Sequence, residues 1–522
     1  MILIASGAFI TSEFQVEFGR LPPALLPLGN LRLYQHQSQV LRSAFPSSDI
    51  FLSLTDAYQL RVHDARLLRD LGIGVITVPD GLTLGESLLF VVNSIGRYDE
   101  PLRLLHGDTL IRDLPPGEDV IALAEVEDAY AWEVESSDQS GDKIWCGYFS
   151  FADVKLLARS LCAQRGKFVE AVRDYRRYRP QDLVEVHEWL DLGHVNTYFR
   201  SRARFTTARS FNELAIHEGV VRKSSTQQLK MQAEANWFAS IPPALRRYTP
   251  QVIRRIENRG RQFTYELEYL AQLPLNELYV HGGLSLTFWK RIFRLVERLL
   301  KEFQAQVQIN KQQANSIEED FHDLVYKKTN VRLADYLENC GLTVNDHPSF
   351  NGRLLPSIKQ IAEECQEATM KLAPRHGISH GDLCFSNILY DSRLSALKVL
   401  DPRGLNARSE MVILGDLKYD IAKFSHSIVG LYDHIVAGLY ELKITESLNF
   451  EFEIYVDETT RTVQKEYVNN VRLLGIAAAD VQPLVVLLFL SMLPLHSDNP
   501  SRQAAFFANA LRLYIDWKRF VK

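Results

Sequence analysis

Short apolar runs, separated by polar turns and amphipathic stretches, dominate the N-terminal part of the chain. The runs that predict buried strands are Ile2–Ile4, Ile50–Leu54, Gly74–Val78, Leu88–Val92, Leu102–Leu105 and Val120–Val126. Buried strands that alternate with crossover helices are typical of a layered α/β domain with a mostly parallel sheet. We therefore predict an α/β domain over residues 1–205.

The hydrophobic pattern changes near residue 205. A helix is predicted over Gln227–Ser240, and the later part of the chain has mostly amphipathic helical spacing. This order predicts an α+β domain over residues 206–522, with a small lobe over about 206–275 and a helical lobe over about 276–522. The segments that predict short antiparallel strands are Ala203–Thr207, Leu214–Glu218, Val220–Lys223 and Phe263–Leu270.

The charge of the 522 residues is nearly balanced, with 59 Lys and Arg against 64 Asp and Glu and a net charge of -5. A protein that binds nucleic acid mainly by electrostatics needs a basic face, so this balance argues against a nucleic-acid partner. Apolar residues make up 46% of the chain and charged residues 24%, which is typical of folded globular domains.

Cysteine spacing and apolar segments bear on the compartment. The apolar run Leu484–Leu495 is too short for a membrane span and contains Pro494, so we expect a buried helix rather than a transmembrane segment. No two cysteines form a C-x-x-C pair, which argues against a disulfide framework or a structural zinc site. We therefore expect a cytoplasmic protein, and the oligomeric state stays open. The five cysteines are Cys146, Cys162, Cys340, Cys365 and Cys384.

The strongest chemical signal is the segment His380–Asp401, HGDLCFSNILYDSRLSALKVLD. Asp382 and Asn387 are five residues apart, and Asp401 follows the apolar run Ala396–Leu400, which predicts a strand. Phosphoryl transfer requires a carboxylate that orients or deprotonates the attacking hydroxyl. It also requires oxygen ligands for Mg²⁺, which an amide and a second carboxylate provide. We therefore assign Asp382 as the candidate catalytic residue, and Asn387 and Asp401 as candidate metal ligands.

This region resembles the aminoglycoside phosphotransferase and choline kinase family, which is related to protein kinases. HGDLCFSNIL is similar to the family's HGDxxxxNIL loop, VLDPRG to its metal-binding Asp segment, and YDIAKFSHS, with Tyr419, Asp420 and Lys423, to its YDLA helix. The resemblance implies a bilobal protein-kinase-like fold, Mg²⁺, ATP or another NTP as donor, and a small hydroxyl-bearing acceptor such as a sugar, polyol or amino-alcohol. It also implies that Asp420 supports the catalytic loop.

By the same resemblance, the small lobe carries the residues that bind the nucleotide. Lys223, at the end of a predicted strand, is expected to contact the phosphates. Glu234, on the next helix, is expected to pair with it, because a buried lysine needs a counter-charge. No glycine-rich loop precedes Lys223, and TTARSFN occupies that place in the sequence, so Ser210 and Asn212 are the expected nucleotide contacts there.

Three N-terminal segments resemble sugar-phosphate nucleotidyltransferases. LPPALLPLGN is similar to their P-K-x-L-L-P-x segment, LLHGDTL to a strand-end Gly-Asp pair, and WLDLGH to their W-x-D-x-G element. The resemblance implies a Rossmann-like sheet in which Asp108 and Asp191 hold Mg²⁺. The metal would bind a second NTP, from which a nucleotidyl group passes to a sugar phosphate.

The N-terminal part also departs from that family. The loop after the first strand, IASGAFITSEF, has only Gly7 where the family has a glycine-rich loop, and Pro23 replaces the family's lysine. Glycine-rich turns cradle phosphate with backbone amides that no side chain crowds. Arg20 is a candidate for partial replacement of the missing charge.

Three hypotheses remain open. In the first, the chain is a bifunctional kinase and nucleotidyltransferase that makes an activated precursor for a surface polysaccharide such as a capsule. In the second, only the kinase is active and the N-terminal domain binds a substrate or partner. In the third, the chain is an inactive scaffold, which the intact set of Asp382, Asn387 and Asp401 argues against.

Overall fold

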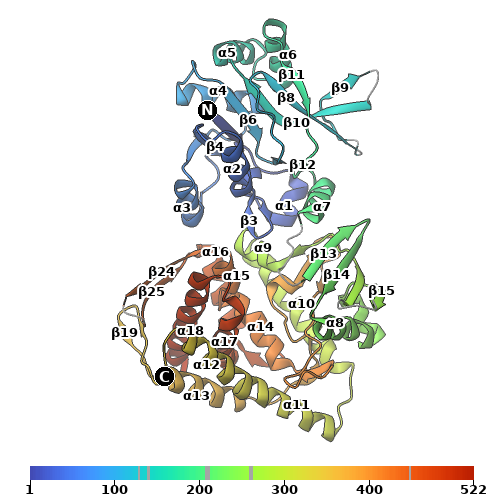
Figure 1. Ribbon diagram of the computed structural model, residues 1–522, viewed down its shortest axis with the longest axis vertical. Helices are drawn as coiled ribbons and strands as arrows, with labels where there is room; N and C mark the ends of the chain where they lie inside the picture. Colours follow the sequence, from blue (N-terminus) through green and yellow to red (C-terminus); the bar gives the residue numbers. More distant parts are fainter. Residues whose placement is uncertain are drawn as a thin grey trace. The chain divides into compact units, whose positions relative to one another are not determined.

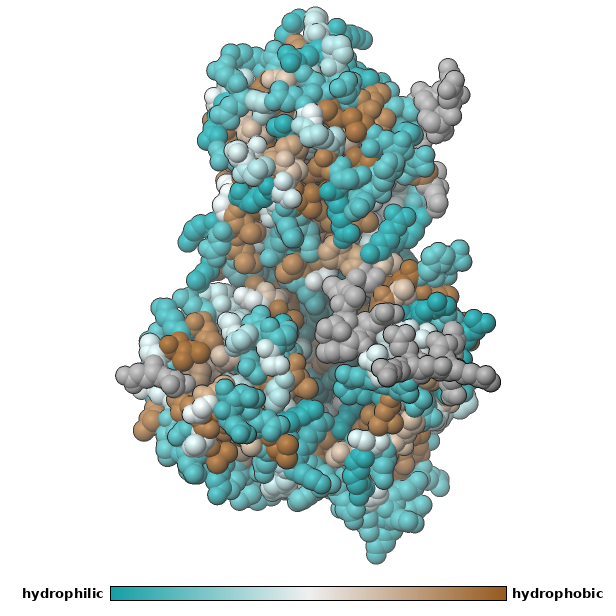
Figure 2. All heavy atoms as spheres, viewed as in Figure 1, coloured by the Kyte–Doolittle hydropathy of each residue, from teal (hydrophilic) through white to brown (hydrophobic). Residues whose placement is uncertain are grey.

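The computed structural model describes residues 1–126, 128, 130–137, 141–205, 212–257, 263–445 and 448–521. The chain forms two compact units: unit 1 contains Met1–Phe205 and His281–Gly283, and unit 2 contains Thr206–Val280 and Leu284–Lys522. On the face drawn in Figure 2, hydrophilic residues cover most of the surface, and apolar residues form separate patches.

Unit 1 is built on an eight-stranded sheet in the order β11-β8-β10-β6-β1-β4-β5, and β9 also pairs with β10 (Figure 1). β1 pairs in parallel with β4 and β6, whereas β10 runs antiparallel to β6 and β8, so the sheet is mixed. The strands are β1 (Ile2–Ala5), β4 (Ile50–Thr55), β5 (Ile73–Val78), β6 (Leu102–His106), β8 (Val120–Glu125), β9 (Val134–Ser137), β10 (Gly141–Phe151) and β11 (Asp182–Glu185).

Helices cover both faces of this sheet because side chains along a strand alternate between its faces. Ile2 and Ile4 of β1 belong to one core, with residues of α2 and α3, whereas Leu3 belongs to a second core with residues of α4, α5 and α6. The helices of unit 1 are α1 (Ser12–Phe18), α2 (Leu33–Ala44), α3 (Val62–Asp70), α4 (Leu84–Ile95), α5 (Val154–Ala163), α6 (Phe168–Tyr178) and α7 (Val195–Arg204).

Two sequence-based strand predictions in this unit are wrong. Leu88–Val92 lies inside α4, where a buried apolar run cannot be distinguished from a strand by its composition. A capping box precedes it: the Thr83 backbone N–H donates to Glu86 Oε2 at 2.9 Å, and the Glu86 N–H donates to Thr83 Oγ1 at 3.3 Å. Ala203, predicted to begin a strand, lies in α7, and residues 206 and 207 are outside the described residues.

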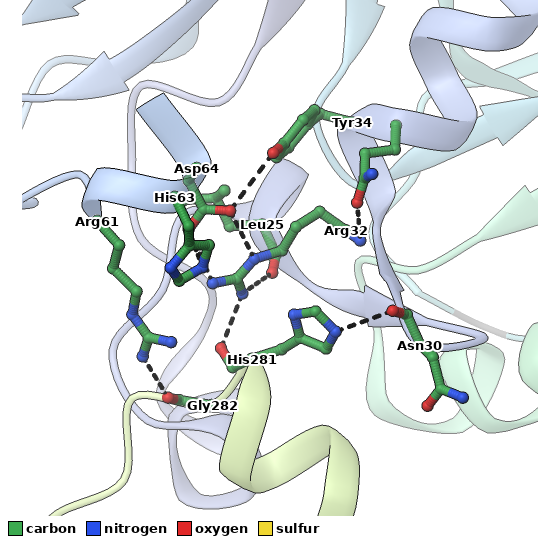
Figure 3. Close-up of polar contacts among 10 residues, drawn as sticks. Leu25, Asn30, Arg32, Tyr34, Arg61, His63, Asp64, His281 and Gly282 are labelled. Atoms are coloured by element: carbon green, nitrogen blue, oxygen red, sulfur yellow. Dashed lines mark hydrogen bonds and ion pairs between the residues drawn. The ribbon is translucent and has the colours of Figure 1, made fainter. Parts of the chain in front are cut away.

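A fully buried ion pair connects α2 and α3 with a segment from much later in the chain (Figure 3). The Arg32 guanidinium donates to Asp64 from Nε at 3.1 Å and from Nη2 at 3.0 Å. Its Nη1 donates to the backbone carbonyls of Leu25 and His281, both at 2.7 Å. Arg32 is therefore surrounded by acceptors, which compensates for the cost of burying its charge.

Hydrogen bonds to its backbone atoms also join the tripeptide His281–Gly283 to the rest of unit 1. The Arg61 guanidinium donates to the Gly282 carbonyl at 2.5 Å, and the Gly283 N–H donates to the Phe18 carbonyl at 2.7 Å. A methyl group on Gly19 would come within 2.3 Å of the Gly283 carbonyl oxygen, so this close approach requires glycine. Unit 1 is therefore discontinuous in sequence, which the sequence-based boundary near residue 205 does not capture.

Unit 2 begins with a four-stranded antiparallel sheet in the order β13-β14-β16-β15, against which α8 packs (Figure 1). The sequence predicted β13, β14, α8 and β16, and their placement agrees with those predictions to within a few residues at each end. The elements are β13 (Asn212–His217), β14 (Val220–Ser225), α8 (Gln228–Ser240), the 3₁₀ turn η2 (Pro243–Tyr248), β15 (Val252–Glu257) and β16 (Phe263–Glu268).

The rest of unit 2 is mostly helical. Its helices are α9 (Leu275–Val280), α10 (Leu286–Ala305), α11 (Lys311–Asp323), the π-helix η3 (Leu324–Lys328), α12 (Thr329–Asn339), α13 (Ile358–Met370), the 3₁₀ turn η4 (Phe385–Asn387), α14 (Leu417–Ile428), α15 (Tyr432–Val436), α16 (Glu458–Asn470), α17 (Ala478–Met492), the 3₁₀ turn η5 (Leu493–His496) and α18 (Pro500–Val521).

Short strands between these helices position the candidate site. β21 and β22 form a hairpin, β20 pairs with β23, and β24 and β25 form a hairpin that β18 and β19 extend. The strands are β17 (Leu273–Pro274), β18 (Ser349–Phe350), β19 (Arg353–Leu354), β20 (His376–Ile378), β21 (Ile388–Asp391), β22 (Ala396–Val399), β23 (Leu414–Asp416), β24 (Tyr440–Thr445), β25 (Asn449–Ile454), β26 (Arg472–Leu473) and β27 (Ile476–Ala477).

The apolar helical segment Ala478–His496 is long and apolar enough to cross a membrane by length and composition alone. In the structure, 72% of its apolar window is buried, and α17 packs against α14 and α18. Core helices of globular domains have the same composition, and burial within unit 2 agrees with the buried helix that the sequence predicted.

Candidate functional site

The side chain of Lys223 joins the small sheet of unit 2 to the segment that follows β22. Its ammonium lies 2.7 Å from Glu234 Oε1 on α8 and also contacts Asp401 Oδ1. The Tyr265 hydroxyl on β16 donates to the same oxygen of Glu234. Burial disfavours the charge of Lys223, but Asp401 and Glu234 outweigh burial and hold its pKa above the usual range. Lys223 is therefore a fixed cation.

The candidate catalytic loop surrounds Asp382 with cationic and amide donors. Lys423 Nζ, on α14, lies 2.9 Å from Asp382 Oδ1, and Asn387 Nδ2 donates to Asp382 Oδ2 at 3.2 Å and to its backbone carbonyl at 2.9 Å. Burial opposes ionisation of Asp382, but the charge of Lys423 prevails and holds the pKa of this carboxyl below its usual range. Asp382 is thus ionised at neutral pH.

The Asp420 carboxylate holds the backbone of this loop in place by accepting hydrogen bonds from it. Its Oδ2 accepts hydrogen bonds from the His380 N–H and the Ser379 hydroxyl, both at 2.9 Å, and its Oδ1 accepts one from the Gly381 N–H at 2.7 Å. Burial raises the pKa of Asp420 to about 7, against the effect of these three donors. This supporting position matches what the sequence resemblance implied for Asp420.

The His380 side chain is buried under the loop and supports the loop structurally. Its Nδ1 accepts a hydrogen bond from the Asp382 N–H at 3.3 Å, and its ring packs edge-on against Trp237. Burial lowers the pKa of His380 to about 4, so the imidazole is neutral at neutral pH. The side chain thus stabilises the loop conformation without adding charge to the site.

The β21–β22 hairpin brings the two candidate metal ligands together. Ile388 pairs with Val399, and the Leu400 N–H donates to the Asn387 carbonyl at 2.9 Å, so Asn387 and Asp401 lie at the same end of the hairpin. Asp401 has a φ of 56°, a left-handed conformation that non-glycine residues adopt rarely, most often Asn and Asp. Such backbone strain is concentrated at functional sites.

The donor set at this end of the hairpin fits Mg²⁺. Asn387 donates its amide nitrogen to Asp382, and its amide oxygen, which accepts only a long hydrogen bond of 3.4 Å from the Ser386 hydroxyl, is a hard ligand. The Asp401 side chain is 40% exposed. Within the described residues, no group of three or more His, Cys, Asp or Glu is arranged to hold a metal ion. Asn387 and Asp401 would thus hold the ion together with the phosphate oxygens of a nucleotide.

The two remaining nucleotide contacts predicted from the sequence are not located by side chain. Ser210 lies outside the described residues. Asn212 begins β13, and its backbone pairs with Ser225 of β14, but its side chain is outside the described part. Their assignment stays a prediction.

Sequence reasoning did not assign a role to Lys423, although it lies in the quoted YDIAKFSHS segment. On a helix, residues three apart lie on neighbouring positions of one face. Asp420 and Lys423 are three apart on α14, and both reach the catalytic loop, Asp420 at its backbone and Lys423 at Asp382. The spacing within this helix therefore contained a signal for Lys423.

In unit 1, Asp108 and Asp191 border one cavity of about 570 Å³, which His106 and His194 also line. Asp108 precedes β7 (Thr109–Ile111), and Asp191 ends β12 (Trp189–Asp191), the antiparallel partner of β7. A methyl group on Gly193 would meet Asp108 Oδ2 at 2.6 Å and Asp191 Oδ1 at 3.3 Å. The fold thus brings together the two acids that the sequence paired.

Protein groups already engage Asp191. Its Oδ2 accepts a hydrogen bond from the Thr197 hydroxyl at 2.6 Å and lies 2.7 Å from His194 Nδ1, and its Oδ1 accepts one from the Gly193 N–H at 2.9 Å. The hydrogen bond to Asp191 raises the pKa of His194. Burial raises the pKa of Asp108, and the negative charge of Asp191 adds to this effect. The Asp191 carboxylate is therefore already bonded to His194, Thr197 and Gly193.

Side chains fill the loop after β1. A methyl group on Gly7 would meet Ser87 Oγ and Val78 Cγ2, each at 2.7 Å. The Arg20 guanidinium lies 3.9 Å from the centre of the Phe9 ring, and its Nη2 lies 3.5 Å from Asp80 Oδ2. Arg20, the expected partial replacement for the family's lysine, is thus engaged by Phe9 and Asp80.

Known proteins resemble the chain only distantly. No protein-family model and no curated protein matches it. Among solved structures, a nucleoside-diphosphate-sugar pyrophosphorylase from Vibrio cholerae RC9 is similar to it with 13% identity and a TM-score of 0.33, over 39% of this chain and 99% of that chain.

Similar structures also include phosphotransferases. A thermostable mutant of aminoglycoside phosphotransferase APH(4)-Ia, in its apo form, has 10% identity and a TM-score of 0.37, over 60% of this chain and 92% of that chain. A choline/ethanolamine kinase family protein from Mesorhizobium loti has 12% identity and a TM-score of 0.33, over 59% and 86%. Both families that the motifs resemble are thus represented among the similar structures.

Proposed function

We propose that unit 2 is a phosphotransferase that moves the γ-phosphate of ATP or another NTP to a hydroxyl group of a small molecule. The observation that carries the proposal is the pairing of two half-exposed acids with buried lysines. Lys223 contacts Asp401, and Lys423 contacts Asp382, at the two ends of one loop and hairpin. Preorganised charges of both signs are what phosphoryl transfer requires, because little covalent chemistry is left to the protein.

Each residue has one role in the proposed reaction. Asp382 accepts the hydrogen bond of the acceptor hydroxyl, orients its oxygen toward the γ-phosphorus and takes its proton as the new P–O bond forms and the bond to the leaving ADP oxygen breaks. Lys423 keeps Asp382 ionised before the reaction. Lys223, held by Glu234, supplies positive charge to the phosphates of the donor.

Asn387 and Asp401 would hold Mg²⁺ through their side-chain oxygens. When bound, the ion supplies Lewis-acid neutralisation of the charge on the phosphates. The N–H of Leu400, the residue before Asp401, donates to the Asn387 carbonyl. This hydrogen bond fixes the spacing of the two ligands.

The test is a screen of hydroxyl compounds with Mg²⁺ and ATP, read as ADP release, on wild type, Asp401→Ala and Asn387→Ala. We expect Asp401→Ala to abolish nearly all transfer and raise the Mg²⁺ requirement, and Asn387→Ala to act similarly but more weakly. Asp498→Ala, on an exposed ion pair with Arg502, is the matched control. Unchanged Mg²⁺ dependence in both site variants would overturn the two-ligand arrangement.

We further propose that unit 1 binds a nucleotide or a sugar phosphate in the cavity that contains Asp108 and Asp191. Support comes from the placement of both acids on one cavity of about 570 Å³. The crowding of Gly7 and the engagement of Arg20 favour binding without nucleotidyl transfer. If transfer does occur, the chain would combine two steps toward an activated precursor for a surface polysaccharide.

Pyrophosphate release separates these two possibilities. Wild type is incubated with each NTP and a panel of sugar 1-phosphates, and nucleotide binding is measured in parallel by calorimetry. Pyrophosphate release that Asp108→Ala removes would support transfer. Binding without release, weakened by Asp108→Ala, would support a binding domain, and absence of both would contradict the proposal for unit 1.

A further inference from the structure

Four basic side chains near the candidate catalytic loop act on one another through their charges, and we call them the basic cluster: Lys328, Arg332, Arg403 and Lys423. Lys328 ends the π-helix η3, and Arg332 lies four residues later on α12, so the two occupy one helix face. The charges of Arg403, Arg332 and Lys423 all act on Lys328. Single-turn π-helices are rare and are found mostly at functional sites.

The basic cluster borders the candidate catalytic residue. Lys423 is the cation 2.9 Å from Asp382. The Arg403 N–H donates to the His380 carbonyl at 2.8 Å, and a methyl group on Gly381 would meet Arg403 Cβ at 2.8 Å. Arg403 therefore lies directly against the loop that presents Asp382.

Tyr419 and a small cavity lie beside Arg403. The Arg403 guanidinium lies 6.0 Å from the centre of the Tyr419 ring, and Tyr419 is four residues before Lys423 on α14. Arg403, Tyr419 and Asp320 line a cavity of about 40 Å³ together with Ser379, His380 and Gly381 of the loop. This volume exceeds what one water molecule requires, and Arg403 is the member of the basic cluster that lines it, alongside Leu324 of η3.

The negative charge near the cluster does not balance it. In the described part of the chain, no carboxylate forms an ion pair within 4.0 Å with Lys328, Arg332 or Arg403. The Arg332 guanidinium donates instead to the Ser491 carbonyl at 3.1 Å. Asp320 is the acid whose charge reaches Lys328, but it accepts the Ala407 N–H at 2.6 Å.

This arrangement destabilises the protonated form of Lys328. Burial, followed by the charges of Arg403, Arg332 and Lys423, lowers the pKa of Lys328 to about 6. An uncompensated group of like charges destabilises a folded protein, and such groups are found where a ligand of opposite charge binds. An anion between these side chains would restore the charge of Lys328 and form several charge-assisted hydrogen bonds.

We propose that the basic cluster binds an anionic group of the acceptor, a phosphate or carboxylate, while the acceptor hydroxyl lies at Asp382. This inference rests on the proposed phosphotransfer by unit 2 and names its substrate class: an anionic hydroxyl compound. The donor phosphates have their own cation, Lys223, beside Asp401. Three members of the basic cluster come instead from η3, α12 and α14 of the helical lobe, and Arg403 lies in the loop after β22, against Gly381; Lys423 contacts Asp382 itself. A cationic amino-alcohol would meet the like charges of Arg332, Arg403 and Lys423 there.

The first experiment measures binding of matched acceptor pairs to the full chain by calorimetry, with and without saturating Mg²⁺ and AMP-PNP. AMP-PNP fills the position of the γ-phosphate, so an added anion reports the acceptor side. The pairs are glycerol 3-phosphate and glycerol, ribose 5-phosphate and ribose, and glucuronate and glucose, with ethanolamine as the cation. We expect at least one anionic member to bind about tenfold or more tightly than its neutral partner.

Variants assign that preference to the cluster. Lys328→Met and Arg332→Met, singly and together, keep aliphatic volume and remove charge. We expect the double variant to lose the preference for the anion while the Kd for Mg²⁺ and AMP-PNP stays within about twofold. Because the change relieves like-charge repulsion, we expect no loss of thermal stability. Lys327→Met, at the exposed neighbouring position, is the matched control and should keep the preference.

The outcomes separate this inference from the proposed function. Equal or tighter binding of the neutral or cationic members, or an anion preference that survives the double variant, would overturn the anionic acceptor and leave phosphotransfer intact. Conversely, absence of Mg²⁺-dependent AMP-PNP binding would overturn phosphotransfer. The anion preference measured without nucleotide would still decide whether the cluster binds anions.

Discussion

The enclosed ion pair in unit 1 and the lysine–acid pairs in unit 2 place similar charges in different surroundings. Arg32 and Asp64 have side chains that are 1% and 0% exposed, and Arg32 also donates to two backbone carbonyls. In unit 2 the lysines are mostly buried, at 9% and 19% exposure, whereas their acids Asp401 and Asp382 are each 40% exposed.

The difference distinguishes a structural pair from a reactive one. A carboxylate enclosed by its partners has no free oxygen for a substrate, so it contributes to the fold. A carboxylate that is held on one side and exposed on the other can accept a ligand without reorganising its partner. The two cavity acids of unit 1 are intermediate in how far protein groups occupy their oxygens. His194 and Thr197 form hydrogen bonds with Asp191 and not with Asp108.

The largest expected effect is on phosphotransfer, from Asp382→Asn. The amide cannot take the hydroxyl proton, so we expect the rate to fall about 10²–10⁴-fold with little change in thermal unfolding or in ATP binding. ADP release under saturating Mg²⁺ and ATP measures the rate. Asp335→Asn, at an exposed position on α12, is the control. Wild-type turnover in Asp382→Asn would refute the assignment of Asp382.

The converse change is Asp64→Asn in unit 1, which should affect stability and leave the chemistry of unit 2 unchanged. It leaves Arg32 buried without a counter-charge, and we expect a loss of about 3–5 kcal/mol in the free energy of unfolding of unit 1. Calorimetric unfolding measures it. Asp70→Asn, exposed at the end of α3, should change little. A fall in ADP release at temperatures where the variant is folded would contradict this separation.

Acid titration gives a smaller effect with a defined sign. Burial opposes the charge of Asp64, but Arg32 prevails and lowers its pKa from 3.8 to about 2. A folded-state pKa below the unfolded one gives stability that is present above pH 3.8 and is lost as the pH falls through about 2, on the order of 2 kcal/mol.

The measurement compares thermal unfolding of wild type and the double variant Arg32→Met, Asp64→Leu between pH 5 and pH 2. Groups that titrate elsewhere in the chain are common to both proteins, so they cancel in the difference. We expect the wild type to lose more stability on acidification than the double variant. Parallel curves would show that the buried pair does not titrate in this window.

The smallest expected effect on the kinase comes from the cavity acids of unit 1. Asp108→Ala and Asp191→Ala should leave ADP release within about twofold of wild type, because Lys223, Asp382, Asn387 and Asp401 all belong to unit 2. Any nucleotide or sugar phosphate binding by unit 1 should weaken in the same variants. Loss of ADP release in a folded variant would show that the two sites are not independent.

Local sequence patterns and family resemblance were sufficient to name the candidate residues that the structure brings together in unit 2. The apolar run before Asp401 predicted a strand, which the structure contains as β22, whereas its pairing with β21 was not predicted. The Lys223–Glu234 pair was expected from the family resemblance, and the structure places the two side chains in contact. The prediction for Leu88–Val92 was wrong because a buried apolar run is compatible with either a strand or a helix, although Thr83 and Glu86 marked a helix start.

The sequence by itself determined which residues are candidates for the site and many of the elements that present them, because loops, caps and strand alternation depend on neighbours along the chain. Only the tertiary structure decided which charges meet. Arg32 and the His281 carbonyl are 249 residues apart, and Lys328 lies far in sequence from Arg403 and Lys423, yet these groups share one environment. Coulomb energy and desolvation depend on distance through space and on burial, and neither quantity is set by spacing along the chain.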